Sequence, residues 1–335
     1  MNMRFTTLLV ASLTFLSFSV FADEASKKLR EVADHLQDIS VTIKADNPNG
    51  YGGSEGSGTM IVREVDGEKI TFVWTAGHVI DHLRSVRTVI NESGQPVKLV
   101  EFSDPTIVKE LVEKGRRVGE MKMDARVIKF SDADNGEDLA LLMVRARDYA
   151  KAGSKFRLEK EDDNIVPIGT RLFHVGSLLG QMGANSMTTG IISQVGRTLG
   201  KVEYDQTTVT AFPGSSGGGV YLTDGRYVGM LVRGAGEGFN LIVPVRRMER
   251  WAKKHNIMWA LDASVPMPSL DEIDELPVEA AGPSKRSKKS DEEKAALKAL
   301  PFLIKIMPAS GQSTLESELI KRPTNEGISP KLELR

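Results

Sequence analysis

The sequence contains no cysteine, and this absence removes several kinds of chemistry at once. A disulfide scaffold, a thiol nucleophile, an iron–sulfur cluster and a cysteine zinc site are all excluded. Aromatic residues are scarce at 6%, and 44 Lys and Arg stand against 45 Asp and Glu in 335 residues, so the formal net charge is only −1. A basic chain that coats nucleic acid and an acidic solvating chain are therefore excluded too. With 40% hydrophobic residues, the composition is that of a soluble chain of one large or two small globular domains.

The first 22 residues have the pattern of a secretory signal peptide. Arg4 supplies a positive charge, residues 8–20 are apolar, and the small side chains of Val20 and Ala22 stand at the −3 and −1 positions of a cut. The apolar run is shorter than the about 20 residues that span a membrane, although an uncleaved membrane anchor is the alternative interpretation. We therefore expect a signal peptide at 1–22 and a mature protein that is periplasmic or secreted, with no stable membrane span.

The following segments differ in their periodicity. Residues 23–38 predict an N-terminal amphipathic helix, because apolar side chains recur at helical spacing among charges. From residue 39 onward, about a dozen short β-type runs are separated by turn signals, a pattern that predicts an all-β barrel or sandwich. Two segments depart from it: helical spacing predicts a helical insertion over 104–117 and a closing helix over 246–255.

The last 75 residues are unlike the rest of the chain. They contain eight of the 14 prolines, and the basic run 285–289 is followed at once by the acidic run 291–293. Such a composition buries little apolar surface, so we expect a largely disordered C-terminal tail over 261–335. Because opposite charges stand side by side, the basic run is interpreted as a solvated linker, and contact with a membrane or nucleic acid is the less favoured alternative.

Three short blocks contain the residue types that carry chemistry. They are Trp74-Thr75-Ala76-Gly77-His78-Val79, Glu137-Asp138-Leu139-Ala140-Leu141-Leu142 and Pro213-Gly214-Ser215-Ser216-Gly217-Gly218-Gly219. Taken singly, each block is a weak signal, because a structural histidine, an aspartate at a strand start and a flexible turn are commoner than catalytic groups.

Together the blocks provide the parts of an activated serine. A serine hydroxyl needs a base within hydrogen-bond reach, and a neutral imidazole suits that role. The imidazole needs a carboxylate that holds its tautomer and stabilises the imidazolium. Glycines around the serine let backbone N–H groups converge on the oxyanion that forms when a carbonyl is attacked. His78, Asp138 and Ser216 supply these groups in that order along the chain.

These blocks resemble those of chymotrypsin-fold (trypsin-like) serine endopeptidases, and most of all the bacterial HtrA-type (Deg-type) branch. The matching motifs are Thr75 to Val79, Asp138 to Leu142 and Pro213 to Gly218, with Ser215 where the family has Asn. The resemblance covers roughly residues 39–255. It implies a serine protease domain over 39–260, built from two packed six-stranded antiparallel β-barrels. The chain would pass from the first barrel to the second near residues 150–165.

The resemblance also implies the composition of the site. The catalytic residues would be His78 and Asp138 from the first barrel and Ser216 from the second, and the backbone N–H groups of Gly214 and Ser216 would form the oxyanion hole. Substrate would be a polypeptide bound at Thr210, Val232, Arg233 and Gly234. The uncharged Thr210, six residues before the serine, would form the pocket floor and favour cleavage after small or medium apolar residues.

The sequence departs from the family in two places. Trypsin-like zymogens carry an Asp before the serine, where this chain has Ser215, so the oxyanion loop must be held in another way. The tail is too rich in proline and too poor in strand pattern to be the PDZ domain that HtrA-type enzymes usually carry.

Other interpretations stay open at this stage. The alternative function is a catalytically inactive protease-like module that binds peptides, and a scaffold that acts through its tail is unsupported. An α/β-hydrolase is disfavoured, because its chain order is Ser, Asp, His. His82 lies one helical turn after His78 without a third ligand at a suggestive spacing, so we expect no metal site, and no cofactor is implied. The oligomeric state is not indicated.

Overall fold

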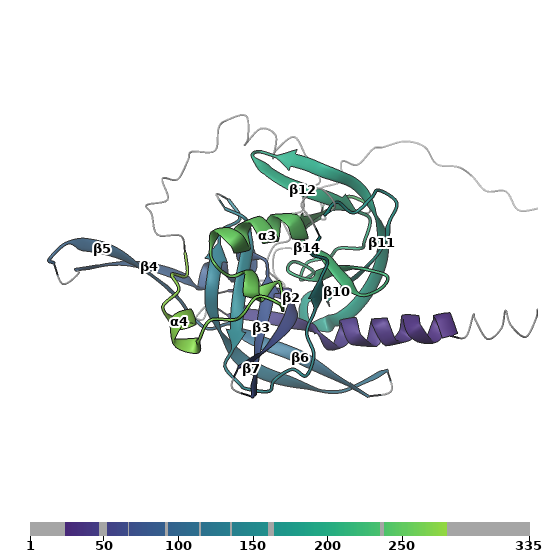
Figure 1. Cartoon of the computed structure of the whole chain (residues 1–335), viewed down its shortest axis with the longest axis horizontal. Coiled ribbons are helices and arrows are strands. Elements are labelled where there is room, and N and C mark those ends of the chain that lie inside the picture. The colour runs from purple at the N-terminus through teal and green to yellow at the C-terminus, as the bar shows by residue number, and fades with distance from the viewer. Residues whose placement is uncertain are drawn as a thin grey trace, which may run out of the picture.

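The computed structural model describes residues 24–46, 52–65, 67–90, 93–113, 115–134, 136–159, 164–234 and 238–279. The predicted signal peptide at 1–22 and residues 280–335 of the predicted tail lie outside these ranges. A helix over residues 24–38 extends from the body of the molecule (Figure 1). Within the described ranges, no helix has both the length and the apolar character needed to cross a membrane.

Six antiparallel strands close into the first barrel in the order β1-β2-β3-β8-β7-β6. Their bounds are β1 Ser40–Asp46, β2 Gly53–Val65, β3 Glu68–Thr75, β6 Thr106–Glu113, β7 Arg116–Ser131 and β8 Leu139–Val144. The apolar runs read in the sequence form its interior, where Phe72, Trp74 and Leu141 are fully buried. This barrel therefore has a continuous apolar core that can hold a site at the ends of β3 and β8.

The second barrel is built from the order β13-β10-β11-β12-β15-β14, which an additional β13–β14 pairing closes, while β9 adds to β14 in parallel. The bounds are β9 Lys155–Phe156, β10 Arg171–Leu178, β11 Gly183–Leu199, β12 Val202–Thr207, β13 Gly219–Leu222, β14 Arg226–Gly234 and β15 Asn240–Pro244. The predicted all-β fold of two six-stranded antiparallel barrels is thus confirmed.

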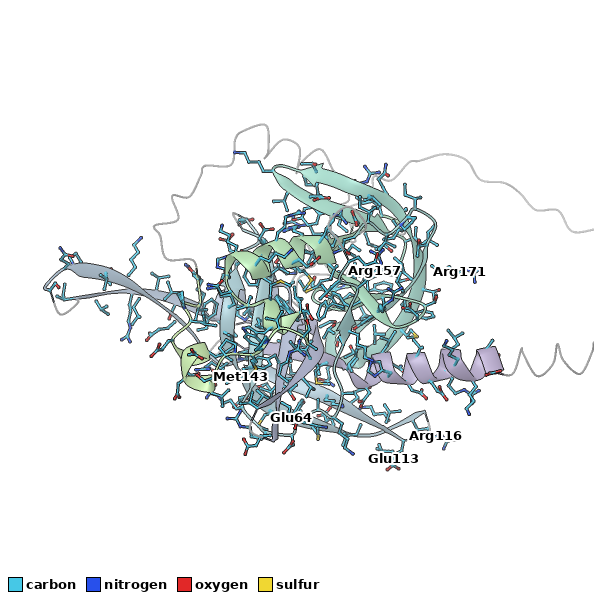
Figure 2. All side chains as sticks on the ribbon, in the orientation of Figure 1. Glu64, Glu113, Arg116, Met143, Arg157 and Arg171 are labelled. Carbon is cyan, nitrogen blue, oxygen red and sulfur yellow. The ribbon has the colours of Figure 1, made fainter. Side chains whose placement is uncertain are left out.

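The helical insertion predicted over 104–117 is wrong, because this segment forms β6 and the start of β7. Ile107 and Val108 are both buried, and β6 pairs with β1 on one side and β7 on the other. The apolar pairs at 107–108 and 111–112 fit helical spacing in the sequence, but Leu111 and Val112 are exposed at the end of β6 and do not belong to the core. Glu113 and Arg116 face each other across the turn that joins the two strands (Figure 2).

A two-stranded hairpin projects from the first barrel directly after the segment that bears His78. It consists of β4 Arg84–Ile90 and β5 Pro96–Phe102, which pair only with each other in the described chain. Figure 1 shows it extending away from both barrels. Its apolar side chains are partly solvent-exposed, and Ile90 is the most exposed of them.

The packed part of the chain continues beyond residue 260, where the tail was expected to begin. The closing helix is α3 Val245–Lys254, in agreement with the prediction over 246–255. After it, the Trp259 ring packs edge-on against Phe72 of the first barrel with centroids 4.9 Å apart. A short helix, α4 Leu270–Asp274, starts with a capping box formed by Ser269 and Glu272. The expected domain boundary at residue 260 is therefore too early, because residues 261–279 pack against the first barrel.

Ile273 of α4 provides a test of this packing. Its side chain is 2% exposed, so Ile273→Ala is expected to lower the free energy of unfolding by about 2–5 kcal/mol, as for other large-to-small core changes. Ile168→Ala is the matched control, because Ile168 is 60% exposed and such a change alters stability by about 0.5 kcal/mol or less. Urea unfolding gives both values. Equal midpoints for the two variants would mean that α4 contributes nothing to the fold.

Candidate active site

His78 is placed by the end of β3. The chain leaves this strand at Thr75 and turns into α2 Gly77–Ile80, with His78 in its first turn. A Cβ at position 77 would lie 2.3 Å from the Ser131 carbonyl oxygen, so only glycine allows this approach. The His78 backbone N–H donates to Asp138 Oδ1 at 3.0 Å, and the ring remains 24% exposed. The imidazole is thus fixed at one edge and accessible at the other.

Asp138 is buried directly before β8 and contacts the His78 ring. Both carboxylate oxygens lie 3.0 Å from His78 Nδ1. Burial by itself would raise the pKa of Asp138, but the attraction of His78, two hydrogen bonds from His78 and the charge of Arg233 outweigh it and hold this pKa below its ordinary value. Asp138 therefore stays ionised near neutral pH and orients the imidazole with Nε2 free.

The backbone of Asp138 adopts the left-handed conformation, with φ +54°, which residues other than glycine rarely use. Arg247 of α3 holds the preceding residue: its Nε donates to Glu137 Oε2 at 2.5 Å and its Nη2 to the Glu137 carbonyl at 2.6 Å. The guanidinium is buried and also stacks on the Tyr204 ring. Strained backbone persists where its surroundings over-determine it. Arg247, which the sequence analysis did not single out, is such a constraint.

Ser216 lies in a turn whose carbonyl groups are all engaged. Gly214 and Gly217 have φ of +93° and +88°, a conformation that glycine allows. Four successive carbonyls accept one hydrogen bond each: Pro213 from Leu179 N–H at 2.7 Å, Gly214 from Ser57 Oγ at 2.7 Å, Ser215 from Gly218 N–H at 3.0 Å and Ser216 from Ser57 N–H at 2.7 Å. The turn therefore has one well-determined conformation.

The anchored carbonyls determine where two N–H groups of the turn point. In a trans peptide the C=O and N–H bonds point in opposite directions. The carbonyls of Pro213 and Ser215 are bonded, so the N–H groups of Gly214 and Ser216 point away from those partners, and neither has an acceptor among the described residues. Unpaired N–H groups in a buried turn are rare and provide donors for an oxyanion. The two predicted oxyanion-hole residues thus have the required free donors.

The turn lies against the segment that bears His78. A Cβ at Gly217 would be 2.4 Å from Thr75 Oγ1 and 3.1 Å from the Ala76 nitrogen. The Ser216 residue is 2% exposed, and its Oγ has no hydrogen-bond partner among the described residues. The structure therefore contains the His78–Asp138 contact but no His78–Ser216 hydrogen bond. In enzymes without substrate this bond is often long and tightens in the Michaelis complex.

The residues expected to bind substrate lie on the second barrel. Val232 is buried at a β-bulge of β14, and the Arg233 guanidinium lies over the Tyr204 ring. Thr210, the expected pocket floor, is exposed, and residues 235–237 lie outside the described ranges, so its role stays a prediction. Gly234 faces Asn240, whose Oδ1 a Cβ at 234 would approach to 2.7 Å.

Asn240 is a further residue here that the sequence analysis missed. Its Nδ2 donates to the Val209 carbonyl at 2.6 Å, which ties the strand β15 to the segment before Thr210. Nothing in the sequence distinguishes this asparagine from a turn residue. Among the described residues, no group of three or more His, Asp or Glu side chains is arranged to hold a metal ion.

His174 of β10 is buried beside Gly218 and Gly219, at the end of the turn. Its Nδ1 lies 3.0 Å from the Gly219 carbonyl and therefore carries the proton, whereas Nε2 is buried without a partner. Burial lowers the pKa of His174 to about 4, against a smaller opposite effect of the Gly219 hydrogen bond. An unfolded chain binds a proton at this residue below about pH 6.5, while the native protein does not until about pH 4.

Stability is therefore expected to decrease as the pH falls from 6.5 to 4, because the unfolded state binds more protons in that window. The contribution of His174 is about 3 kcal/mol. His174→Asn keeps a donor for Gly219 and does not titrate, so its unfolding free energy should change with pH by that much less. Urea midpoints between pH 4 and 7 test this, and parallel pH curves for the two proteins would contradict it.

The family model described as a trypsin-like peptidase domain matches residues 56–230. Among solved structures, the chain is similar to an HtrA-type protease, AlgW, with a tripeptide, at 18% identity over 68% of this chain and 63% of that chain, with a TM-score of 0.46. It is also similar to Deg5, at 19% identity over 71% of this chain and 98% of that chain, with a TM-score of 0.48. The chain thus covers less than two thirds of the AlgW chain. A search of curated proteins found no match.

The family match is the finding that decides the assignment. It extends over more than half of the chain and includes the positions of His78, Asp138 and Ser216. The two barrels have the architecture that the sequence motifs predicted. The chain therefore belongs to the trypsin-like peptidase family, and it has a chymotrypsin-like fold.

Proposed function

We propose that the protein hydrolyses peptide bonds with His78, Asp138 and Ser216 as its catalytic triad. One observation carries this proposal: the turn that bears Ser216 has two unpaired N–H groups and lies against the segment that bears the His78–Asp138 pair. This arrangement combines a nucleophile, an oriented base and oxyanion donors, which acyl transfer requires.

In the proposed reaction, Ser216 Oγ attacks the carbonyl carbon of the substrate while His78 Nε2 takes the hydroxyl proton. The N–H groups of Gly214 and Ser216 stabilise the tetrahedral oxyanion, and Asp138 stabilises the imidazolium. His78 then donates the proton to the leaving amine, and an acyl-enzyme on Ser216 remains. Water, deprotonated by His78, releases the acyl group and restores the hydroxyl.

The proposed substrate is an extended polypeptide that pairs as an additional strand beside Val232, Arg233 and Gly234. A small or medium apolar residue would precede the cut bond, because Thr210 offers no charge to bind a basic side chain. We also propose that the enzyme acts after export to the periplasm or the exterior, and the signal-peptide pattern at 1–22 supports this.

A second candidate function is peptide binding without turnover. The observation that favours it is the buried Ser216 Oγ, which has no hydrogen bond to His78. A fluorophosphonate probe separates the two functions, because it labels a serine only when a base activates it. Residues 23–335 would be treated with the probe, and the label would be located by peptide mapping.

Labelling at Ser216 that disappears in His78→Ala, together with cleavage of unfolded casein, is the result expected of the enzyme. A folded protein that neither takes up the probe nor cleaves casein would favour the binding module. Cleavage that persists in Ser216→Ala would contradict the proposed triad.

A further inference from the structure

The turn that bears Ser216 is held by a residue of the opposite barrel, Ser57. This residue lies in β2 and is fully buried. It forms four hydrogen bonds: its N–H with the Ser216 carbonyl at 2.7 Å, its Oγ with the Gly214 carbonyl and the Ser177 N–H, both at 2.7 Å, and its carbonyl with Thr75 Oγ1 at 2.8 Å. One serine thus contacts both barrels and two carbonyls of the catalytic turn.

The backbone of Ser57 is available because β3 ends beside it. The register of β2 and β3 begins at the pair Thr59 and Trp74 and runs away from Ser57, so the edge of β2 at Ser57 has no strand partner in β3. The turn of the second barrel takes this place, and the Ser216 carbonyl accepts the N–H that a neighbouring strand would otherwise bind. The backbone carbonyl of Ser216 therefore pairs with the N–H of Ser57 in the first barrel, as in one hydrogen bond of a β-sheet.

The hydroxyl of Ser57 has only one possible arrangement of its proton. Ser177 N–H is a donor, so Ser57 Oγ accepts from it, and the single hydroxyl proton is left for the Gly214 carbonyl. The same hydroxyl thereby connects β10 with the turn. A Cβ at Gly214 would lie 2.3 Å from the Ser177 carbonyl, which shows how closely the turn approaches that strand.

The turn has no charged group that could hold it instead. Ser215, before the nucleophile, is neutral and fully buried, and its Oγ accepts only from the Phe212 N–H of the same turn at 3.1 Å. That bond shapes the turn but does not fix its position relative to the first barrel, which carries His78. The hydrogen bonds of Ser57 shape the turn and also fix its position relative to the first barrel.

We propose that Ser57 is a positioning residue of the oxyanion hole: its hydroxyl holds the peptide between Gly214 and Ser215, which joins the two peptides that carry the Gly214 and Ser216 donors, so that these donors face the reacting carbonyl. This inference rests on the proposed function of that turn. Without the hydroxyl, the Gly214 carbonyl and the Ser177 N–H would lose their partner inside a closed site, and the turn would relax toward conformations that satisfy them.

Ser57→Ala tests this role. We expect kcat for a peptide substrate to fall by about 10²-fold with little change in KM, as when one oxyanion donor is lost. The inhibition constant of a peptide aldehyde with valine at its carbonyl end should rise by a similar factor, because its adduct with serine carries the oxyanion. Ser57→Cys fills similar space with a weak donor and should give an intermediate loss; it carries the test if the alanine variant does not fold.

Ser40→Ala is the matched control. Ser40 is a buried serine of the same barrel, and its Oγ has no partner among the described residues. All rates are expressed per site labelled by fluorophosphonate after complete reaction, which removes the effect of a merely destabilised fold. A wild-type protein that neither labels nor hydrolyses would refute the proposed function itself. An active wild type with Ser57→Ala equal to Ser40→Ala in kcat and aldehyde inhibition would overturn the role of Ser57 alone.

Discussion

Replacing His78 by alanine is expected to lower kcat for peptide hydrolysis by about 10⁶-fold. The imidazole is the only base in contact with Asp138 among the described residues, and the hydroxyl of Ser216 has no hydrogen-bond partner among them. The remaining activity would come from the oxyanion donors and from substrate binding. Initial rates on a fluorogenic peptide, with enzyme concentration varied to exclude a contaminant, measure this.

His82→Ala is the matched control, because His82 follows in the same segment but is exposed. Its activity should stay close to that of the wild type. If the two variants lost activity equally, the loss would come from the local fold of residues 77–83 and not from the base.

Replacing Asp138 by asparagine is expected to lower kcat by about 10⁴-fold while the protein stays folded. The carboxylate accepts hydrogen bonds from the backbone N–H and from Nδ1 of His78. An amide in the same position presents a donor that can hold the imidazole in the wrong tautomer, with its proton on Nε2. The ring would then be unable to take the proton of Ser216.

Asp148→Asn controls for the backbone, because Asp148 also has a φ of +54° but is exposed and outside the site. Its kcat should be that of the wild type. Rates at several pH values and thermal unfolding of both variants separate catalysis from folding. A kcat for Asp138→Asn within tenfold of the wild type would remove Asp138 from the triad.

The sequence predicted the architecture well where apolar alternation was regular. The runs around Phe72, Trp74 and Leu141 are buried strands, as expected. It failed over 104–117, because Leu111 and Val112 of β6 are apolar although they are exposed, and they extend the apolar pattern at helical spacing. It also placed the end of the packed chain too early. The helix α4 has only five residues, and it packs on the first barrel, which is far from it in the sequence.

The candidate site divides in the same way. His78, Asp138 and Ser216 were predicted because local motifs surround them, and the structure places the first two in contact. Ser57 and Arg247 act through long-range hydrogen bonds, from Ser57 Oγ to the Gly214 carbonyl and from Arg247 to the side chain and carbonyl of Glu137. A serine in a strand and an arginine on a helix have no local pattern that reveals such partners, so only the fold identifies them.

The hydrogen bonds from Arg247 to Glu137 can form only late in the synthesis of the chain. The chain is made from its N-terminus, so the first barrel, with His78 and Asp138, is complete long before α3 exists. Until α3 docks, the left-handed backbone at Asp138 lacks the guanidinium that secures its neighbour. On the proposed function, a nascent chain would therefore secure the Asp138 backbone, and with it the orientation of His78, only after α3 has docked on the first barrel.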